Sequence, residues 1–232
     1  MKTIINRMFA IFFAATLLIS CDAVKNANNK QKGAVIGTTG GAAIGGVIGN
    51  NTGDGNTALG AIIGGVVGGA AGAIIGDRMD KQAKEIEQEI PGAEVERVGE
   101  GINVTFDESS GVYFDTEKYN INSKSQATLN KLADIFKEYP DSNILVEGHT
   151  DNTGSETYNL TLSKNRAQAV TNYLTSQGLS SGRFNTKWYG ESQPKYDNST
   201  AVGRAKNRRV ELAIVANEEM KEEARRKAEE QN

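Results

Sequence analysis

The sequence has little cysteine, little histidine and no excess of positive charge. Its 232 residues include one cysteine and one histidine, and 26 Lys and Arg against 29 Asp and Glu give a net charge of −3. A single cysteine excludes an intramolecular disulfide. Without a basic excess we expect no nucleic-acid partner, because binding to a phosphate backbone depends on Lys and Arg. Since no serine or cysteine has an evident base beside it, we also expect no enzymatic activity. Nothing in the sequence calls for a metal or an organic cofactor.

The N-terminus explains the lone cysteine. A basic start is followed by an apolar run at residues 8–19, which is too short for a confident membrane span, and Cys21 comes directly after Ser20. This pattern resembles a bacterial lipobox. The resemblance implies that residues 1–20 are a lipoprotein signal peptide and that Cys21 carries acyl chains such as palmitate. An ordinary signal peptide with an incidental cysteine is the alternative. Asp22 leaves open whether the inner or the outer membrane is the destination.

Glycine is concentrated in one region. After a polar tether at residues 21–32, glycines recur every fourth residue in two runs without charge: Gly33, Gly37, Gly41, Gly45 and Gly49, then Gly60, Gly64, Gly68, Gly72 and Gly76. In a helix this spacing makes one bare stripe, as in small-xxx-small membrane packing, and each run spans roughly 26 Å. The pattern predicts a glycine-zipper hairpin at residues 33–76, inserted in a membrane and returning to the side it left. A low-complexity surface segment, a homo-oligomer and a pore are the alternatives.

Periodicity divides the rest of the chain into three parts. Residues 77–92 read as a charged, solvated helical spacer, and residues 217–232 as an exposed charged tail. Between them, residues 93–216 read as one α+β domain of order β-α-β-α-β-β, a mixed sheet with two helices on one face. We expect helices at residues 123–139 and 156–177, and strands at residues 93–98, 102–106, 112–114, 144–148, 184–190 and 209–215.

Two charges stand out in this domain. Asp151 follows a short apolar strand, and Arg166 lies 15 residues later on the next predicted helix. A carboxylate and a guanidinium placed in this way could bind the two ends of a short zwitterion. A structural ion pair between the same two residues is the alternative.

Several motifs in this region together resemble the OmpA-like periplasmic domain. They are Phe114-Asp115, Gly148-His149-Thr150-Asp151, Tyr158-Asn159, Leu162-Ser163, Arg166-Ala167 and Asn207-Arg208-Arg209-Val210-Glu211. With the lipobox and the glycine runs, the whole chain resembles the YiaD-like group of OmpA-family lipoproteins. The resemblance implies an outer-membrane lipoprotein of a diderm bacterium whose periplasmic domain tethers that membrane to peptidoglycan.

The same resemblance implies a ligand and its contacts. The family binds the diaminopimelate of the peptidoglycan stem peptide without a covalent bond. Asp151 is then expected to bind the ammonium and Arg166 the carboxylate, in a charge-assisted fork. By position, the pocket would also include Phe114, Asp115, Thr150, Leu162, Asn207 and Arg208. Which diamino acid the wall carries stays open.

Three other functions are alternatives. A wall hydrolase would need paired carboxylates, and Asp115, Glu147, Asp151 and Glu191 are the candidates, but nothing in the sequence pairs them. A flagellar-stator role would need an acidic residue inside a membrane helix, whereas Asp54 lies in the polar turn between the glycine runs. The third is that the glycine hairpin carries the main activity as a membrane oligomer or pore.

Overall fold

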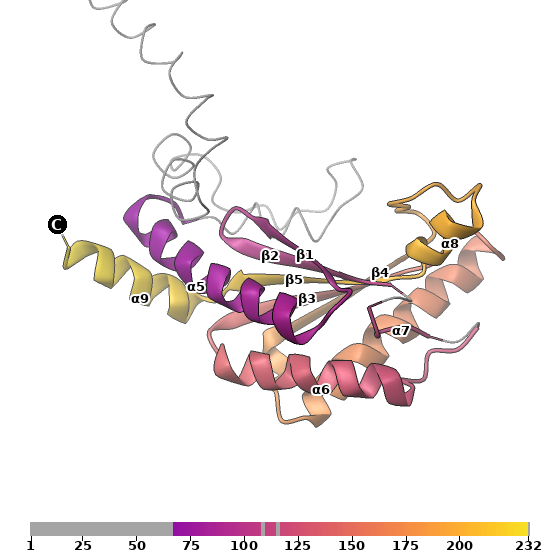
Figure 1. Cartoon of the computed structure of the whole chain (residues 1–232), viewed down its shortest axis with the longest axis horizontal. Helices are drawn as coiled ribbons and strands as arrows, with labels where there is room; N and C mark the ends of the chain where they lie inside the picture. Colours follow the sequence, from indigo (N-terminus) through magenta and orange to yellow (C-terminus); the bar gives the residue numbers. More distant parts are fainter. Residues whose placement is uncertain (1–66, 108–109, 115–116, 232) are drawn as a thin grey trace, which may run out of the picture.

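The computed structural model describes residues 67–107, 110–114 and 117–231. These form a five-stranded sheet of order β1-β2-β5-β3-β4, in which only β3 and β4 are parallel (Figure 1). The elements are α5 (Gly69–Glu89), β1 (Glu94–Val98), β2 (Gly101–Phe106), α6 (Ser123–Glu138), β3 (Ser142–His149), α7 (Glu156–Ser176), η1 (Ser181–Arg183), β4 (Phe184–Gly190), α8 (Ala201–Asn207), β5 (Val210–Ala216) and α9 (Glu218–Glu229).

The core lies between one face of the sheet and the helices α5, α6 and α7 (Figure 1). Alternate residues of β2 point into it, so Ile102, Val104 and Phe106 are buried there. On α6 the buried positions Leu129, Leu132 and Phe136 recur at helical spacing. The predicted α+β class with a mixed sheet is confirmed.

Two parts of the predicted order of elements were wrong, one concerning a strand and one a helix. Residues 112–114 do not form a strand, because the backbone of Tyr113 bonds to side chains of the next helix. Its N–H donates to Ser125 Oγ at 3.1 Å, and its carbonyl accepts from Ser125 Oγ at 2.9 Å and from Asn122 Nδ2 at 3.0 Å. In addition, α8 lies between the last two strands, where no helix was expected. Thr200 caps it by accepting from the N–H of Gly203 at 2.9 Å.

The helix α5 crosses the expected boundary between the glycine hairpin and the spacer. It is continuous through Gly76, and its residues Ile75, Met79 and Ile86 are completely buried against the sheet domain. The prediction of a solvated spacer was therefore wrong for this helix. The spacing of these apolar residues, four and then seven, forms one helical face. The charged residues between them concealed that face in the sequence.

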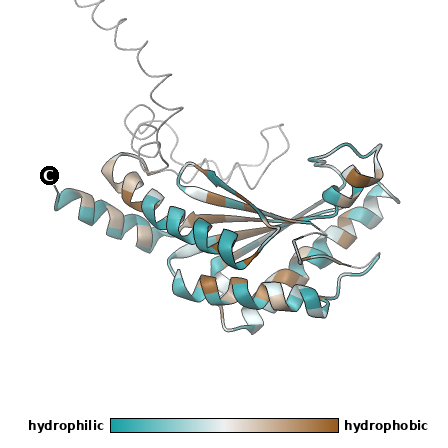
Figure 2. Ribbon diagram, viewed as in Figure 1, coloured by the Kyte–Doolittle hydropathy of each residue, from teal (hydrophilic) through white to brown (hydrophobic). Residues whose placement is uncertain are grey.

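The expected exposed tail is also partly buried. The helix α9 is mostly hydrophilic (Figure 2), but Met220, Ala224 and Ala228 recur every fourth residue and are buried. It lies beside α5 (Figure 1), and Arg78 of α5 pairs with Glu223 of α9 at 2.6 Å. The two ends of the described chain thus pack together on the domain.

The remaining N-terminal predictions fall elsewhere. The signal peptide at residues 1–20, Cys21, the tether at residues 21–32 and the glycine hairpin up to residue 66 lie outside the described residues. Within the part of the chain that the structure describes, no helix is both long and apolar enough to span a membrane.

Candidate functional site

The site begins where β3 ends. The N–H of His149 donates to the carbonyl of Arg209 at 3.0 Å, and the N–H of Thr150 donates to the carbonyl of Gly190 at 2.9 Å. These bonds fix the strand end between β4 and β5. Asp151 is therefore held at a fixed position just beyond the C-terminal end of β3, which is an interior strand of the sheet.

Asp151 forms an ion pair with Arg208. Its Oδ2 accepts from Arg208 Nη1 at 2.8 Å, and its Oδ1 accepts from the N–H of Thr153 at 2.9 Å. Burial raises the pKa of Asp151, but the hydrogen bonds from Arg208 and Thr153 outweigh burial and hold the pKa below its usual value. The carboxylate is consequently charged at neutral pH.

Arg166 reaches the site from α7. It is 3% exposed, its Nε donates to the carbonyl of Lys118 at 3.0 Å, and its guanidinium lies 5.2 Å from the centre of the Phe114 ring. A guanidinium over an aromatic face gains a cation–π attraction, and its planar set of N–H donors keeps a fixed orientation. The structural ion pair between Asp151 and Arg166, which was the alternative to ligand binding, does not form, since Asp151 pairs with Arg208.

The other predicted site residues have different surroundings. Leu162 and Thr150 are buried, and Thr150 Oγ1 has no hydrogen-bond partner. Asp115 lies outside the described residues. Asn207 is fully buried, and its amide is used inside the protein: Oδ1 accepts from two backbone N–H groups at 3.0 Å, and Nδ2 donates to Tyr196 O and Asn198 Oδ1 at 2.8 Å. Asn207 therefore holds the loop before α8 and positions its neighbour Arg208.

The sheet face that no described helix covers carries buried polar side chains that were not predicted as a group. Glu147 and Glu211 face each other across β3 and β5, and both are fully buried. Arg209 Nε donates to Glu211 at 2.6 Å, and the hydroxyl of Tyr189 donates to Glu147 at 3.2 Å. His149 stacks on Tyr189. The period-two alternation along β3 was the signal in the sequence that could have placed Glu147 and His149 on the same face of the sheet. Because Glu147 is inaccessible, it cannot act on a substrate from solvent.

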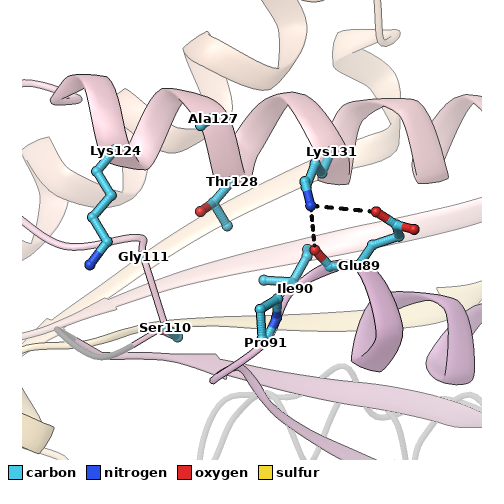
Figure 3. A pocket seen from close by; sticks show the side chains of 9 residues that line it. All are labelled: Glu89, Ile90, Pro91, Ser110, Gly111, Lys124, Ala127, Thr128 and Lys131. Atoms are coloured by element: carbon cyan, nitrogen blue, oxygen red, sulfur yellow. Dashed lines mark hydrogen bonds and ion pairs between the residues drawn. The ribbon is translucent and has the colours of Figure 1, made fainter.

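A cavity of about 230 Å³ lies between α6 and the corner after α5 (Figure 3). Lys131 Nζ donates across it to the carbonyl of Glu89 at 2.9 Å, and Lys124 points toward Gly111 (Figure 3). The described residues that line it include none of the predicted site residues. Among the residues that the structure describes, no group of three or more His, Cys, Asp or Glu could hold a metal ion.

Comparison with known proteins places this geometry in a family. Residues 113–208 match the model of the OmpA family. This chain contains an OmpA-family domain. Residues 1–80 also match the model described as YMGG-like Gly-zipper. The expected resemblance of this domain to the OmpA family and the expected glycine-zipper sequence are thus confirmed, whereas the helical hairpin and its insertion in a membrane stay predictions.

Curated relatives match between 37% and 60% of this chain. Outer membrane porin F of Pseudomonas aeruginosa is 45% identical over 120 residues, covering 51% of this chain and 33% of that protein. Probable lipoprotein YiaD of Escherichia coli is 34% identical over 140 residues, covering 60% and 64%. Peptidoglycan-binding protein ArfA of Mycobacterium tuberculosis is 44% identical over 86 residues, covering 37% and 26%. The chain thus spans less than two thirds of each of these relatives.

A solved structure resembles the OmpA-family domain and the elements beside it. The cell wall anchor of the T6SS from Pseudomonas aeruginosa is 29% identical with a TM-score of 0.51, covering 60% of this chain and 98% of that one. The match extends the likeness from sequence to fold.

Proposed function

We propose that the OmpA-family domain binds peptidoglycan without a covalent bond, through the diaminopimelate of the stem peptide. The observation that carries this proposal is a charged carboxylate, Asp151, held between two loops at the end of β3 and paired with Arg208. The names of two similar proteins, a peptidoglycan-binding protein and a cell wall anchor, support the same partner. The proposed role is binding without catalysis.

The free end of diaminopimelate carries an ammonium and a carboxylate. A carboxylate such as Asp151 has about four acceptor positions, of which Arg208 and Thr153 use two. The ligand's ammonium takes the remaining ones, and its carboxylate takes the guanidinium of Arg166 or Arg208. Charge-assisted bonds of this kind are the stronger class of hydrogen bond in proteins. The zwitterion thereby satisfies charges of both signs at once.

The other predicted contacts divide into two groups. Phe114 lies under the Arg166 guanidinium, and Leu162 is one helical turn before it, so both would form the apolar wall around the ligand's chain. The orphan hydroxyl of Thr150 is a candidate ligand contact, and Asp115 stays a prediction. Asn207 acts indirectly, by positioning Arg208.

For the whole protein we propose a tether between membrane and wall. Cys21 would carry the lipid, and the glycine zipper would embed in or pack on the outer membrane with the OmpA-family domain in the periplasm. Relatives named as an outer-membrane porin and a lipoprotein support this location. Many anchored copies facing a repeating polymer gain avidity, so modest individual contacts suffice.

Co-sedimentation of the full chain with purified peptidoglycan tests the proposal, with free diaminopimelate as competitor. We expect Asp151→Ala and Arg166→Ala to lose most of the sedimenting fraction. Asp134→Ala is the matched control, because Asp134 is an exposed acid on α6 paired only locally with Lys137 at 3.0 Å. A folded Asp151→Ala variant that sediments like the wild type would contradict the proposal.

A further inference from the structure

Large apolar side chains are exposed at only a few places in the described part of the chain. They are Tyr119, Tyr158, Leu160 and Val202, which are between 43% and 68% exposed. Tyr119 precedes α6, Tyr158 and Leu160 lie at the start of α7, and Val202 lies on α8. The start of α7 and α8 lie at the same end of the molecule (Figure 1). Asp151 belongs to this end, because it precedes α7 and pairs with Arg208, which follows α8. Single exposed apolar residues are ordinary, but this grouping around one site calls for an explanation.

Tyr158 extends the line of predicted contacts on α7. Tyr158, Leu162 and Arg166 follow one another at a spacing of four, so they share one face of the helix. Leu162 and Arg166 are buried, whereas Tyr158 is 43% exposed. The Tyr158 ring lies over the loop that follows Asp151, because a methyl group on Gly154 would stand 3.5 Å from Tyr158 Cδ1. These three residues therefore form a line along α7 that runs from the buried Arg166 to the exposed ring of Tyr158.

Tyr119 and Val202 belong to the segments that hold the two arginines. Tyr119 follows Lys118, whose carbonyl accepts from Arg166 Nε at 3.0 Å. Val202 is on α8, which ends directly before Arg208. Each segment that positions a charged group thus also exposes an apolar side chain. Leu160 differs, because two residues correspond to about 200° of helix rotation, which points it away from Tyr158.

We propose that Tyr119, Tyr158 and Val202 form an apolar rim that contacts the sugar rings of the peptidoglycan glycan strand. This rests on the proposed function: a short stem peptide links diaminopimelate to the glycan, so binding of one brings the other to the surface of the domain. A pyranose ring has an apolar C–H face and polar edges. Tyrosine matches it with an apolar ring and a polar hydroxyl, and tyrosine is favoured in interfaces of this amphipathic kind.

The test separates the rim from the charged site by using two soluble ligands. The affinity of the full chain is measured for free diaminopimelate and for a disaccharide–tetrapeptide fragment of peptidoglycan. Tyr158→Ser and Val202→Ser are expected to weaken binding of the fragment roughly three- to tenfold and to leave diaminopimelate binding unchanged. Tyr158→Phe is expected to bind the fragment nearly as the wild type does. Tyr173→Ser is the control, as Tyr173 lies about 22 Å further along α7.

The outcomes distinguish the two proposals. If Tyr158→Ser and Val202→Ser bind the fragment as the wild type does, or lose both ligands equally, the rim does not exist. If Asp151→Ala binds both ligands normally, the proposed function itself fails. Loss of both ligands by Asp151→Ala, with loss of the fragment alone by Tyr158→Ser, supports both proposals. Thermal unfolding of each variant establishes that the binding losses occur in folded protein.

Discussion

Arg208 is predicted to make the site selective for ligands that carry a carboxylate. In the free protein its Nη1 occupies Asp151 Oδ2 at 2.8 Å, so an ammonium alone meets a carboxylate that is already neutralised. A ligand with its own carboxylate can take over Arg208 as the ammonium takes Asp151. Replacing Arg208 by Ala removes the competing cation and also one partner for the ligand's carboxylate.

The free energy of the competition between Arg208 and the ligand's ammonium depends on how far the two side chains are exposed to solvent. A hydrogen bond between charged groups contributes about 1.5–3 kcal/mol when well buried. The side chains of Arg208 and Asp151 are 32% and 10% exposed, respectively, so solvent screening reduces the competition to about 1 kcal/mol, or roughly fivefold in affinity. For Arg208→Ala we therefore expect roughly fivefold tighter binding of a simple diamine such as cadaverine. Diaminopimelate, which loses a carboxylate partner, is expected to bind roughly tenfold more weakly.

Calorimetric titration of both ligands measures this change in selectivity. Arg204→Ala is the matched control, since Arg204 is a nearby arginine on α8 that binds the carbonyl of Asn198 at 2.9 Å instead of Asp151. The decisive quantity is the affinity for diaminopimelate divided by the affinity for cadaverine. This ratio should fall by roughly fiftyfold for Arg208→Ala and remain constant for Arg204→Ala. Unchanged or weaker cadaverine binding by Arg208→Ala would refute the reasoning.

Two further predictions concern stability. Gln82 on α5 is completely buried, and neither of its side-chain polar atoms has a hydrogen-bond partner. Gln82→Met is therefore expected to stabilise the domain by about 2 kcal/mol, measured as a higher melting temperature, whereas Gln88→Met on the exposed face of α5 should change the melting temperature little. Destabilisation by Gln82→Met would contradict this prediction. Burial, and then the charges of Arg209 and Lys195, lower the pKa of His149 well below 6.5. The unfolded chain therefore takes up a proton before the folded one, and stability should fall as pH drops below about 6.5; in denaturant titrations across that range His149→Phe should lose this dependence, and a wild-type slope in that variant would exclude His149 as its source.

The sequence was sufficient for elements whose local signals agree with their packing. On α6, apolar residues at helical spacing and the following Pro140 placed the helix within a residue or two of its observed bounds, and Asn122 caps its start. The helix α7 ends as expected before Gly178, whose φ of 93° suits glycine. In both cases the residues that determine the helix lie within it or beside it.

Where contacts come from distant parts of the chain, the sequence was insufficient. In the sequence of α5 the charged residues conceal the apolar face, and only the contacts with the sheet and with α9 show that this face is buried. Similarly, Asp151 and Arg208 are 57 residues apart, so their pairing depends on β3 and β5 lying side by side. The structural role of Asn207 depends in the same way on the loop before α8. Sequence motifs were enough to select the candidate site residues, but the pairings among them could be seen only in the fold.

The position of Glu100 has a mechanical consequence. Its carboxylate accepts from the N–H groups of Val67 and Gly68 at 2.7 Å, fixing the start of α5 at the turn between β1 and β2. This turn is at the opposite end of β2 from Phe106, which pairs with Val210 beside the Asp151 site. In the proposed tether, a pull between membrane and wall would therefore run along the strands and load the hydrogen bonds between β2 and β5 in shear. All of these hydrogen bonds would share that load at once, and the two bonds to Glu100 would feel it first.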